Sequence, residues 1–217
     1  VTSDAAALCF KTSNAVILRG GSEAMHSNRA IAAAMQSGGE KKGLPPFSIQ
    51  LIETTDREAI RELVQLEGRV DLVMPRGGEG LIRAVTDMAR VPVIKHYKGN
   101  CHVYVDESAN MEMALKIIEN AKCQRPGVCN AMETLLIHEK IAPDFTRSMA
   151  DKLAARGVEL RGDENARKWV PTMKIATEDD WYAEYLDLIL AVKIVPSVQA
   201  AIDHINHYVS HHVDATV

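Results

Sequence analysis

The chain has 217 residues, of which 47% are hydrophobic and 25% charged, and its 25 Lys and Arg against 29 Asp and Glu give a net charge of −4. This composition is typical of a globular protein and excludes collagen-like, low-complexity and disordered classes. A mildly acidic chain has no general electrostatic reason to bind nucleic acid or an anionic membrane. No apolar run reaches the roughly 20 residues of a membrane helix. The 4 cysteines, none in a C-x-x-C pair, predict reduced thiols in a cytoplasmic protein rather than a disulfide scaffold.

Short β-branched runs alternate with amphipathic stretches along the chain, which is typical of an α/β fold. In the first part, the patterns predict strands at 14–18, 48–52, 70–74 and 91–94, and helices at 22–39, 57–66 and 81–89. The run at 70–74 is almost continuously apolar, which predicts a strand in a parallel sheet covered on both faces.

The second part continues the alternation. The patterns predict strands at 101–105, 134–138, 158–160 and 186–195, and helices at 109–122, 142–156 and 197–209. No Pro, Gly and Ser linker separates the two parts. The pattern of the first part ends near residues 118–122, so we expect one domain at 1–118 and a second at 119–217.

A strand, Arg-Gly-Gly and a helix follow one another twice, around 15–24 and around 70–82. Glycines after a strand let the backbone approach a ligand closely, and a helix N-terminus attracts phosphate. Two such turns at the same edge of a parallel sheet would suit a dinucleotide. Neither turn is a full G-x-G-x-x-G, so tight turns without a ligand are the alternative.

Residues 120–133, NAKCQRPGVCNAME, place Cys129 on a Pro-Gly loop between a helix and a strand. Rigid elements often hold reactive groups on such loops. Arg125 and Lys122 precede Cys129, and a nearby cation favours the reactive thiolate. No His is adjacent, so a papain-like pair is not indicated. From spacing alone, a buried structural cysteine is the alternative, and Cys123 is a bystander, a resolving thiol or a disulfide partner, with the bystander favoured.

Several segments carry a family resemblance: AVILRGGSEA at 15–24, DLVMPRGGEG at 71–80, CHVYVD at 101–106, NAKCQRPGVCNAMETLLIH at 120–138, ATEDDW at 176–181 and EYLDL at 184–188. On these segments, and over nearly the whole chain, the sequence resembles γ-glutamyl phosphate reductase, the proline-biosynthesis branch of the aldehyde dehydrogenase superfamily. The resemblance implies an aldehyde-dehydrogenase-like α/β fold, with a Rossmann-like parallel sheet and part of a second α/β catalytic domain. It further implies a cytoplasmic enzyme whose parent is a homo-oligomer.

The reaction implied is the NADPH-dependent reduction of L-glutamate 5-phosphate to L-glutamate 5-semialdehyde and phosphate, through a thioester on a cysteine. By resemblance Cys129 is the nucleophile, and Arg125 and Asn130 beside it are candidates for substrate phosphate and oxyanion contacts. Glutamate 5-kinase is implied as the upstream partner.

The resemblance also assigns the cofactor residues, which are Arg19, Gly20 and Gly21 in the first turn, Arg76, Gly77, Gly78 and Gly80 in the second, and Glu184. An Arg at position 19 could bind a 2′-phosphate with two hydrogen bonds, which favours NADPH over NADH. Glu184 matches the glutamate that holds the nicotinamide ribose. The alternatives are a surface Arg at a strand end and a solvated acid at a strand entry.

The relatives are longer. They carry an Asn upstream of Val1 that resembles an oxyanion-hole side chain, and downstream segments that complete the catalytic domain. We therefore expect a central fragment that is inactive by itself. One alternative function is that of a non-catalytic fragment, and the alternative within the superfamily is an aldehyde dehydrogenase that oxidises an aldehyde. Its base segment, Glu-Leu-Gly-Gly, has no counterpart in KHYKGNC at 95–101, and reduction of an acyl phosphate needs no base to activate water.

A zinc site is a separate hypothesis. His204, His207 and His211 fall at i, i+3 and i+7, with Asp203 and His212 close by, and imidazoles on one helix face can bind zinc. A polar surface face is the favoured interpretation, so we expect no metal.

Overall fold

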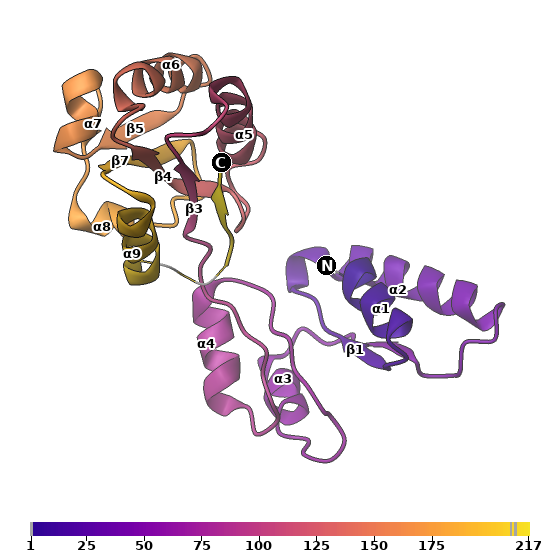
Figure 1. Ribbon diagram of the computed structural model, residues 1–217. Coiled ribbons are helices and arrows are strands. Elements are labelled where there is room, and N and C mark those ends of the chain that lie inside the picture. The colour runs from indigo at the N-terminus through magenta and orange to yellow at the C-terminus, as the bar shows by residue number, and fades with distance from the viewer. Residues whose placement is uncertain (1, 209, 211) are drawn as a thin grey trace. The chain divides into compact units, whose positions relative to one another are not determined.

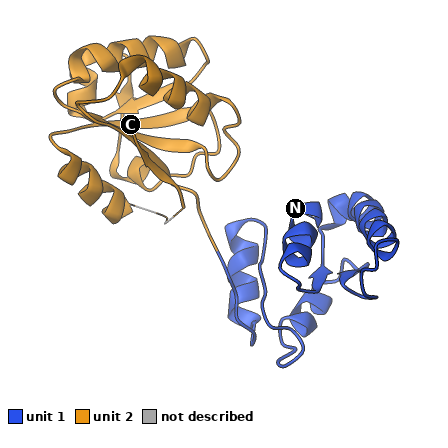
Figure 2. Cartoon of the chain, turned by 45° about the vertical axis from the view of Figure 1, so that its right-hand side comes forward, with its two compact units in different colours: residues 1–95 blue, residues 96–217 orange. Residues whose placement is uncertain are grey.

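The computed structural model describes residues 2–208, 210 and 212–217, and the chain divides into two compact units, residues 1–95 and 96–217 (Figure 2). The expected boundary after residue 118 falls inside α5 (Met111–Cys123) of the second unit. Strand β3 (Cys101–Val105) before this helix pairs with β4 (Met132–His138) after it, so the three elements belong together. The division into a cofactor half and a catalytic half stays a prediction. No helix in the described part of the chain is long and apolar enough to cross a membrane.

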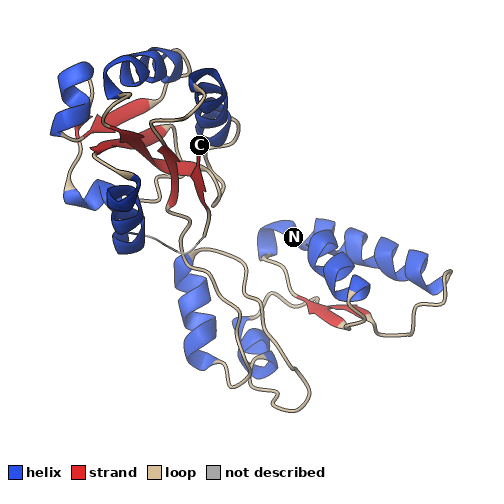
Figure 3. Cartoon of the chain, viewed as in Figure 1, coloured by secondary structure: helices blue, strands red, loops and turns tan. Residues whose placement is uncertain are grey.

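In unit 1, strands β1 and β2 pair in parallel, with Val16 opposite Ile49, and helices α1 and α2 pack against them (Figure 3). The elements in chain order are α1 (Thr2–Lys11), β1 (Val16–Leu18), the 3-10 turn η1 (Ser22–Ala24), α2 (Met25–Glu40), β2 (Ile49–Leu51), α3 (Arg57–Leu63) and α4 (Glu79–Met88). The core beneath β1 and β2 is small, and its buried members are Ala6, Leu18 and Ile49.

The expected strands at 70–74 and 91–94 are wrong as strands. Val73 and Val93 form an isolated parallel bridge, while Leu72 and Met74 are 43% and 51% exposed. An apolar run becomes a central strand only where side chains cover both of its faces, and these two side chains face solvent instead. Two Arg-Gly-Gly turns at the same edge of one parallel sheet would suit a dinucleotide. The described residues do not place them so, because β1 pairs with β2 and Val73 forms its bridge with Val93.

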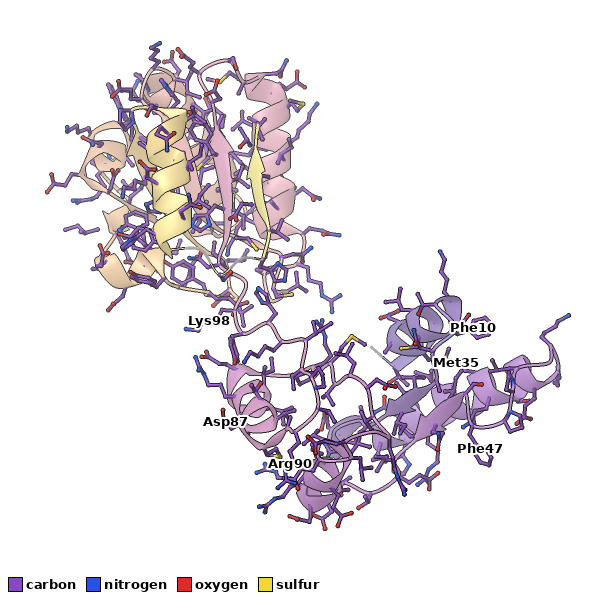
Figure 4. The ribbon with its side chains drawn as sticks, turned by 60° about the horizontal axis from the view of Figure 1, so that its bottom comes forward. Phe10, Met35, Phe47, Asp87, Arg90 and Lys98 are labelled. Atoms are coloured by element: carbon purple, nitrogen blue, oxygen red, sulfur yellow. The ribbon has the colours of Figure 1, made fainter. Side chains whose placement is uncertain are left out.

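Unit 1 also exposes large apolar side chains elsewhere. Phe10 is 60% exposed and Phe47 78%, and both are labelled in Figure 4. Phe47 has a φ of 64° directly after Pro45 and Pro46. The left-handed region is unusual for an aromatic residue.

In the described part of unit 2, six strands form a parallel sheet in the order β6-β5-β7-β4-β3-β8. The elements not yet given are α6 (Ala142–Ala154), β5 (Glu159–Gly162), α7 (Glu164–Trp169), β6 (Lys174–Ile175), α8 (Glu178–Trp181), β7 (Ile189–Val195), α9 (Val198–Tyr208) and β8 (Asp214–Thr216). Together with the parallel sheet of unit 1, this architecture confirms the predicted α/β fold.

The sheet of unit 2 is covered on both faces (Figure 1). On one face, Leu135 and Ile137 of β4 join a large buried cluster with α5, α6 and α7. On the other face, Leu136 packs with Tyr104, Val195 and Ala201 of α9. All seven residues of β4 are buried, as expected for a central parallel strand.

Local sequence signals set the helix starts in this unit. Asn110 caps α5 by accepting from the Met113 N–H at 3.0 Å, and Asp163 caps α7 by accepting from Ala166 at 2.8 Å. Thr177 and Asp180 form a reciprocal capping box at α8. The sequence patterns missed α1, α7, α8, β6 and β8, and four of these are too short to show a hydrophobic period.

Candidate active site

Cys129 lies on a tight turn between α5 and β4. The Ala131 N–H donates to the Val128 carbonyl at 3.0 Å, so Cys129 and Asn130 are the two central residues of the turn. Both side chains are exposed, as is Arg125. The alternative of a buried structural cysteine is therefore wrong, since the Cys129 thiol faces solvent.

The backbone of this turn is held by the segment that enters β3. The Cys101 thiol lies 3.2 Å from the Cys129 carbonyl oxygen, to which it donates. Burial raises the pKa of Cys101 to about 11, so this thiol keeps its proton. Gly99 is buried directly against the turn, because a Cβ there would lie 1.8 Å from the Cys129 oxygen. Only glycine permits this approach.

Lys122 does not serve as a free cation beside Cys129, contrary to our expectation. Its ammonium donates to Glu133 Oε2 at 2.6 Å, and both side chains are fully buried. Burial raises the pKa of Glu133 to about 7, against the opposing attraction of Lys122. The charge of Lys122 is thus committed to the interior. Arg125 remains as the exposed cation of the loop.

Glu184 is half-buried, and its Oε1 accepts a hydrogen bond from the Gly99 N–H at 2.9 Å. It is therefore not the solvated acid of the alternative interpretation. Two residues further on, the Leu186 N–H donates to Glu133 Oε1 at 3.2 Å. Unit 2 thus brings Cys129, with Asn130 beside it, close to Glu184 through Gly99, and Cys101 and Glu133 adjoin the same loop. Arg125 is exposed on this loop.

Sequence reasoning missed Gly99, Cys101 and Glu133. A signal existed for Glu133, since a charged residue lies in the mostly apolar segment 132–138. Such a residue is almost never fully buried unless it is paired. Gly99 and Cys101 gave no signal of this kind.

Cys123, at the end of α5, is half-buried and packs against the large core cluster. Burial is the main cause that raises its pKa. All four cysteines are free thiols, so the disulfide interpretation is wrong in this structure. These observations favour the bystander interpretation.

The first Arg-Gly-Gly turn, in unit 1, leads from β1 into η1 and α2. Arg19 is half-buried, its Nη2 donates to the Thr55 carbonyl at 2.8 Å, and within the described residues its Nε is buried without a hydrogen-bond partner. At Gly20 a Cβ would lie 1.8 Å from Asn28 Nδ2, so this glycine allows close packing of the strand end on α2. Gly21 is the N-cap of η1.

The second turn, also in unit 1, leads into α4. Gly78 is the N-cap of this ten-residue helix and, as a glycine, makes no side-chain capping hydrogen bond. In the described part of the chain, a Cβ at Gly78 or Gly80 would meet no atom within 4 Å, and Arg76 and Gly77 are exposed. The backbone N–H groups at such a helix N-terminus, with open glycines beside them, can donate hydrogen bonds to the phosphate oxygens of a nucleotide. The open Arg76–Gly80 turn and the unsatisfied Arg19 Nε therefore fit a phosphorylated cofactor.

The histidines of α9 do not form the polar surface that we expected, because one of them is buried. His204 is only 5% exposed and packs edge-on against Trp181, with ring centroids 5.4 Å apart. His207 is exposed, and His211 lies outside the described residues. Among the residues that the structure describes, no group of three or more His, Cys, Asp and Glu side chains could hold a metal ion.

The comparisons define the class. The family model described as "Aldehyde dehydrogenase family" matches residues 1–180, and the chain belongs to this family. Among curated proteins, it is 54% identical over all 217 residues to the gamma-glutamyl phosphate reductase of Citrifermentans bemidjiense and 55% identical to that of Rhodopirellula baltica. It covers 52% and 50% of these proteins, so the chain spans about half the length of the curated relatives it matches.

Solved structures agree. The gamma-glutamyl phosphate reductase of Thermotoga maritima matches with a TM-score of 0.90 and 47% identity, over 100% of this chain and 52% of that one. An acetylating aldehyde dehydrogenase from Geobacillus thermoglucosidasius matches with a TM-score of 0.65 at 19% identity, over 94% of this chain and 58% of that one. The second likeness concerns the fold alone. The family implies a nicotinamide cofactor.

Proposed function

We propose that this chain carries the nucleophile and cofactor residues of a cytoplasmic reductase that converts L-glutamate 5-phosphate to L-glutamate 5-semialdehyde and phosphate in proline biosynthesis. The observation that carries the proposal is the exposed Cys129 thiol on a turn whose backbone is fixed by buried groups. The proposed substrate is supported by a curated relative that is named gamma-glutamyl phosphate reductase and is 54% identical across the whole chain. Glutamate 5-kinase, which would make this substrate, is the proposed upstream partner.

Cys129 is the proposed nucleophile. Its thiolate attacks the carbonyl carbon of the acyl phosphate, and the tetrahedral oxyanion expels phosphate to leave a thioester on sulfur. Arg125 lies four residues before Cys129 and its exposed guanidinium can bind the departing phosphate with two hydrogen bonds. Asn130, beside Cys129 in the same turn, can donate to the oxyanion through its side-chain amide.

The proposed cofactor is NADPH, which supplies the hydride that reduces the thioester. Arg19 would hold its 2′-phosphate through its guanidinium, and this role is supported by the Nε, which has no hydrogen-bond partner among the described residues. Gly20, Gly21, Arg76, Gly77, Gly78 and Gly80 would receive the phosphates along the two turns, and Glu184 the nicotinamide ribose. The parent protein is proposed to be a homo-oligomer.

The test is alkylation of the unmodified chain by iodoacetamide, with each cysteine followed by peptide mass spectrometry. We expect Cys129 to react faster than Cys9, Cys101 and Cys123, and NADPH to slow Cys129 alone. Cys129→Ser, with Cys123→Ser as its matched control, assigns the signal. Equal reactivity of Cys129 and Cys123, or no effect of NADPH, contradicts the proposal.

We also propose that the 217-residue chain does not turn over by itself. NADPH oxidation is measured by loss of absorbance at 340 nm with L-glutamate 5-phosphate freshly made by a kinase. A rate above the Cys129→Ser background contradicts this expectation, while leaving the role of Cys129 intact.

A further inference from the structure

The Glu133 carboxylate joins segments that are distant in sequence. One oxygen accepts from Lys122 at the last turn of α5, at 2.6 Å, and the other accepts from the Leu186 backbone N–H, at 3.2 Å. Lys122 and Glu133 flank the loop that carries Cys129, and both are fully buried. The Lys122 ammonium also lies 5.9 Å from the ring centre of Tyr185. A buried charge pair therefore ties both ends of the Cys129 loop to residues 185–186.

Leu186 is held in an unusual backbone conformation. Its φ is 54°, in the left-handed region that costs a branched side chain free energy and persists only where the surroundings impose it. The side chain is 46% exposed, so apolar packing does not explain the conformation. Its backbone N–H donates to Glu133, and its carbonyl oxygen lies 3.7 Å from where a Cβ of Gly127 would lie, so both backbone polar groups of Leu186 face the Cys129 loop and its flank.

Glu184, two residues earlier, extends this connection to the turn itself. Its carboxylate accepts from the Gly99 N–H at 2.9 Å. Gly99 abuts the Cys129 carbonyl so closely that no other residue fits there. A shift of Glu184 would therefore be transmitted to Gly99 through this hydrogen bond. Gly99 contacts the Cys129 backbone, so the shift would reach the Cys129 turn.

We propose that residues 184–186 form a brace, held by the Glu133 carboxylate, which fixes the Cys129 turn, and that Glu133 is thereby a positioning residue for the reaction. The inference rests on the proposed function for its consequence, because a fixed sulfur matters only if Cys129 is the nucleophile. In this brace, Glu184 positions the Cys129 turn already in the absence of a cofactor. Glu133 acts through Leu186 and Glu184 and touches no reacting atom.

The experiment compares two replacements of the buried pair in the full 217-residue chain without cofactor. Lys122→Met with Glu133→Leu keeps the volume and removes the acceptor for Leu186, and apolar replacement of a buried ion pair is often neutral for folding. Lys122→Gln with Glu133→Gln is the conservative pair, because the new amide at position 133 can accept from Leu186 and donate to the new amide at position 122. Lys116→Met with Glu112→Leu removes an exposed pair of the same 2.6 Å length from the same helix and is the matched control.

The readouts are amide exchange at Gly99 and Ala131, resolved by NMR, and the alkylation rate of Cys129. For the apolar pair we expect exchange at both amides to rise at least tenfold and the alkylation rate to change at least threefold. Alkylation of Cys123 and the thermal midpoint should stay as in the parent chain. The double-Gln variant and the exposed-pair control should behave as the parent chain does.

The proposal is overturned if the apolar pair leaves both amides unchanged, or if the double-Gln variant fails to restore them. Glu184→Ala, with Glu184→Gln as its conservative partner, tests the same brace if the apolar pair does not fold. Ala should speed exchange at Gly99 and Ala131, while Gln, which keeps an acceptor, should not. NADPH plays no part in these measurements, so failure of the brace and failure of the proposed function are separate results.

Discussion

At the scale of single residues, unit 2 holds carboxylates in contrasting environments. Glu133 is buried against one ammonium, and its pKa is raised to about 7 because desolvation outweighs the attraction of Lys122. Asp180 is only 4% exposed, yet its pKa falls to about 2. Burial alone would raise it. The hydrogen bonds from Thr177, Arg161 and Tyr185, at 2.7 to 2.9 Å, favour the charged form more strongly.

Asp180 should therefore contribute to acid sensitivity. Its folded pKa lies below the ordinary value of 3.8, so its contribution is present above that pH and is lost as the pH falls toward 2. The difference corresponds to about 2 kcal/mol. Urea unfolding at pH 7, 4 and 2.5 should show Asp180→Asn less stable at pH 7 and flatter below pH 4 than the parent chain.

Asp151→Asn, at an exposed position of α6, is the control for this measurement and should follow the parent chain at every pH. Parallel pH profiles for Asp180→Asn and the parent chain would count against the hydrogen-bonded role of Asp180.

At the scale of elements, the sequence predicted most helices and strands of the chain where the hydrophobic period was long. The predicted helix at 109–122 became α5 at 111–123, and the strand at 134–138 became β4 at 132–138. The apolar run at 70–74 was misleading, because periodicity cannot tell whether another layer will cover a strand. Helix α2 ends at Glu40, past the two glycines expected to end it.

The glycines near the end of α2 offer a matched pair. A Cβ at Gly38 would meet none of the described residues within 4 Å, whereas one at Gly39 would lie 2.5 Å from Leu44 Cδ2 and 3.1 Å from Leu44 Cβ. Gly38→Ala should raise the free energy of unfolding of unit 1 by about 0.5–1 kcal/mol, since Ala loses less entropy in a helix. Gly39→Ala should give no such gain. Chemical denaturation measures both, and a larger gain at position 39 would contradict the packing described.

At the scale of the whole molecule, the two units differ in how much they bury. Unit 2 has a continuous cluster around Leu135, Ile137 and Phe145, while the buried cluster beneath β1 and β2 contains Ala6, Leu18 and Ile49. Large apolar side chains such as Phe10, Phe47 and Ile94 are exposed in unit 1. Apolar burial is the main favourable contribution to folding, so the units should differ in stability.

Native-state hydrogen exchange should show this difference. We expect amides of β4 and β7 to open with free energies at least about 2 kcal/mol above those of β1 and β2. The urea dependence of exchange at single amides measures both. Equal protection in the strands of the two units would argue against separate stabilities.

The sequence by itself determined the local chemistry of this protein. The alternating patterns predicted an α/β fold, and the residues around Cys129 placed the thiol on a loop between a helix and a strand and pointed to the family. These properties depend on neighbours within a few positions, which a pattern can represent. The structure then shows the geometry of those motifs. Cys129 is exposed on a turn at 128–131, and α4 begins at a glycine N-cap.

Only the tertiary structure decided how the thiol is held. Glu133 meets Leu186 across 53 positions, Glu184 meets Gly99 across 85, and Cys101 meets Cys129 across 28. The parallel pairing of β3, β4 and β7 brings the segments that enter these strands together at one end of the strands. The crossovers between the strands give the sequence no signal of which segments will meet. The sequence alone predicted that Lys122 is a cation beside Cys129. Its burial against Glu133 also depends on the tertiary structure, because this pair is buried only once the sheet has formed.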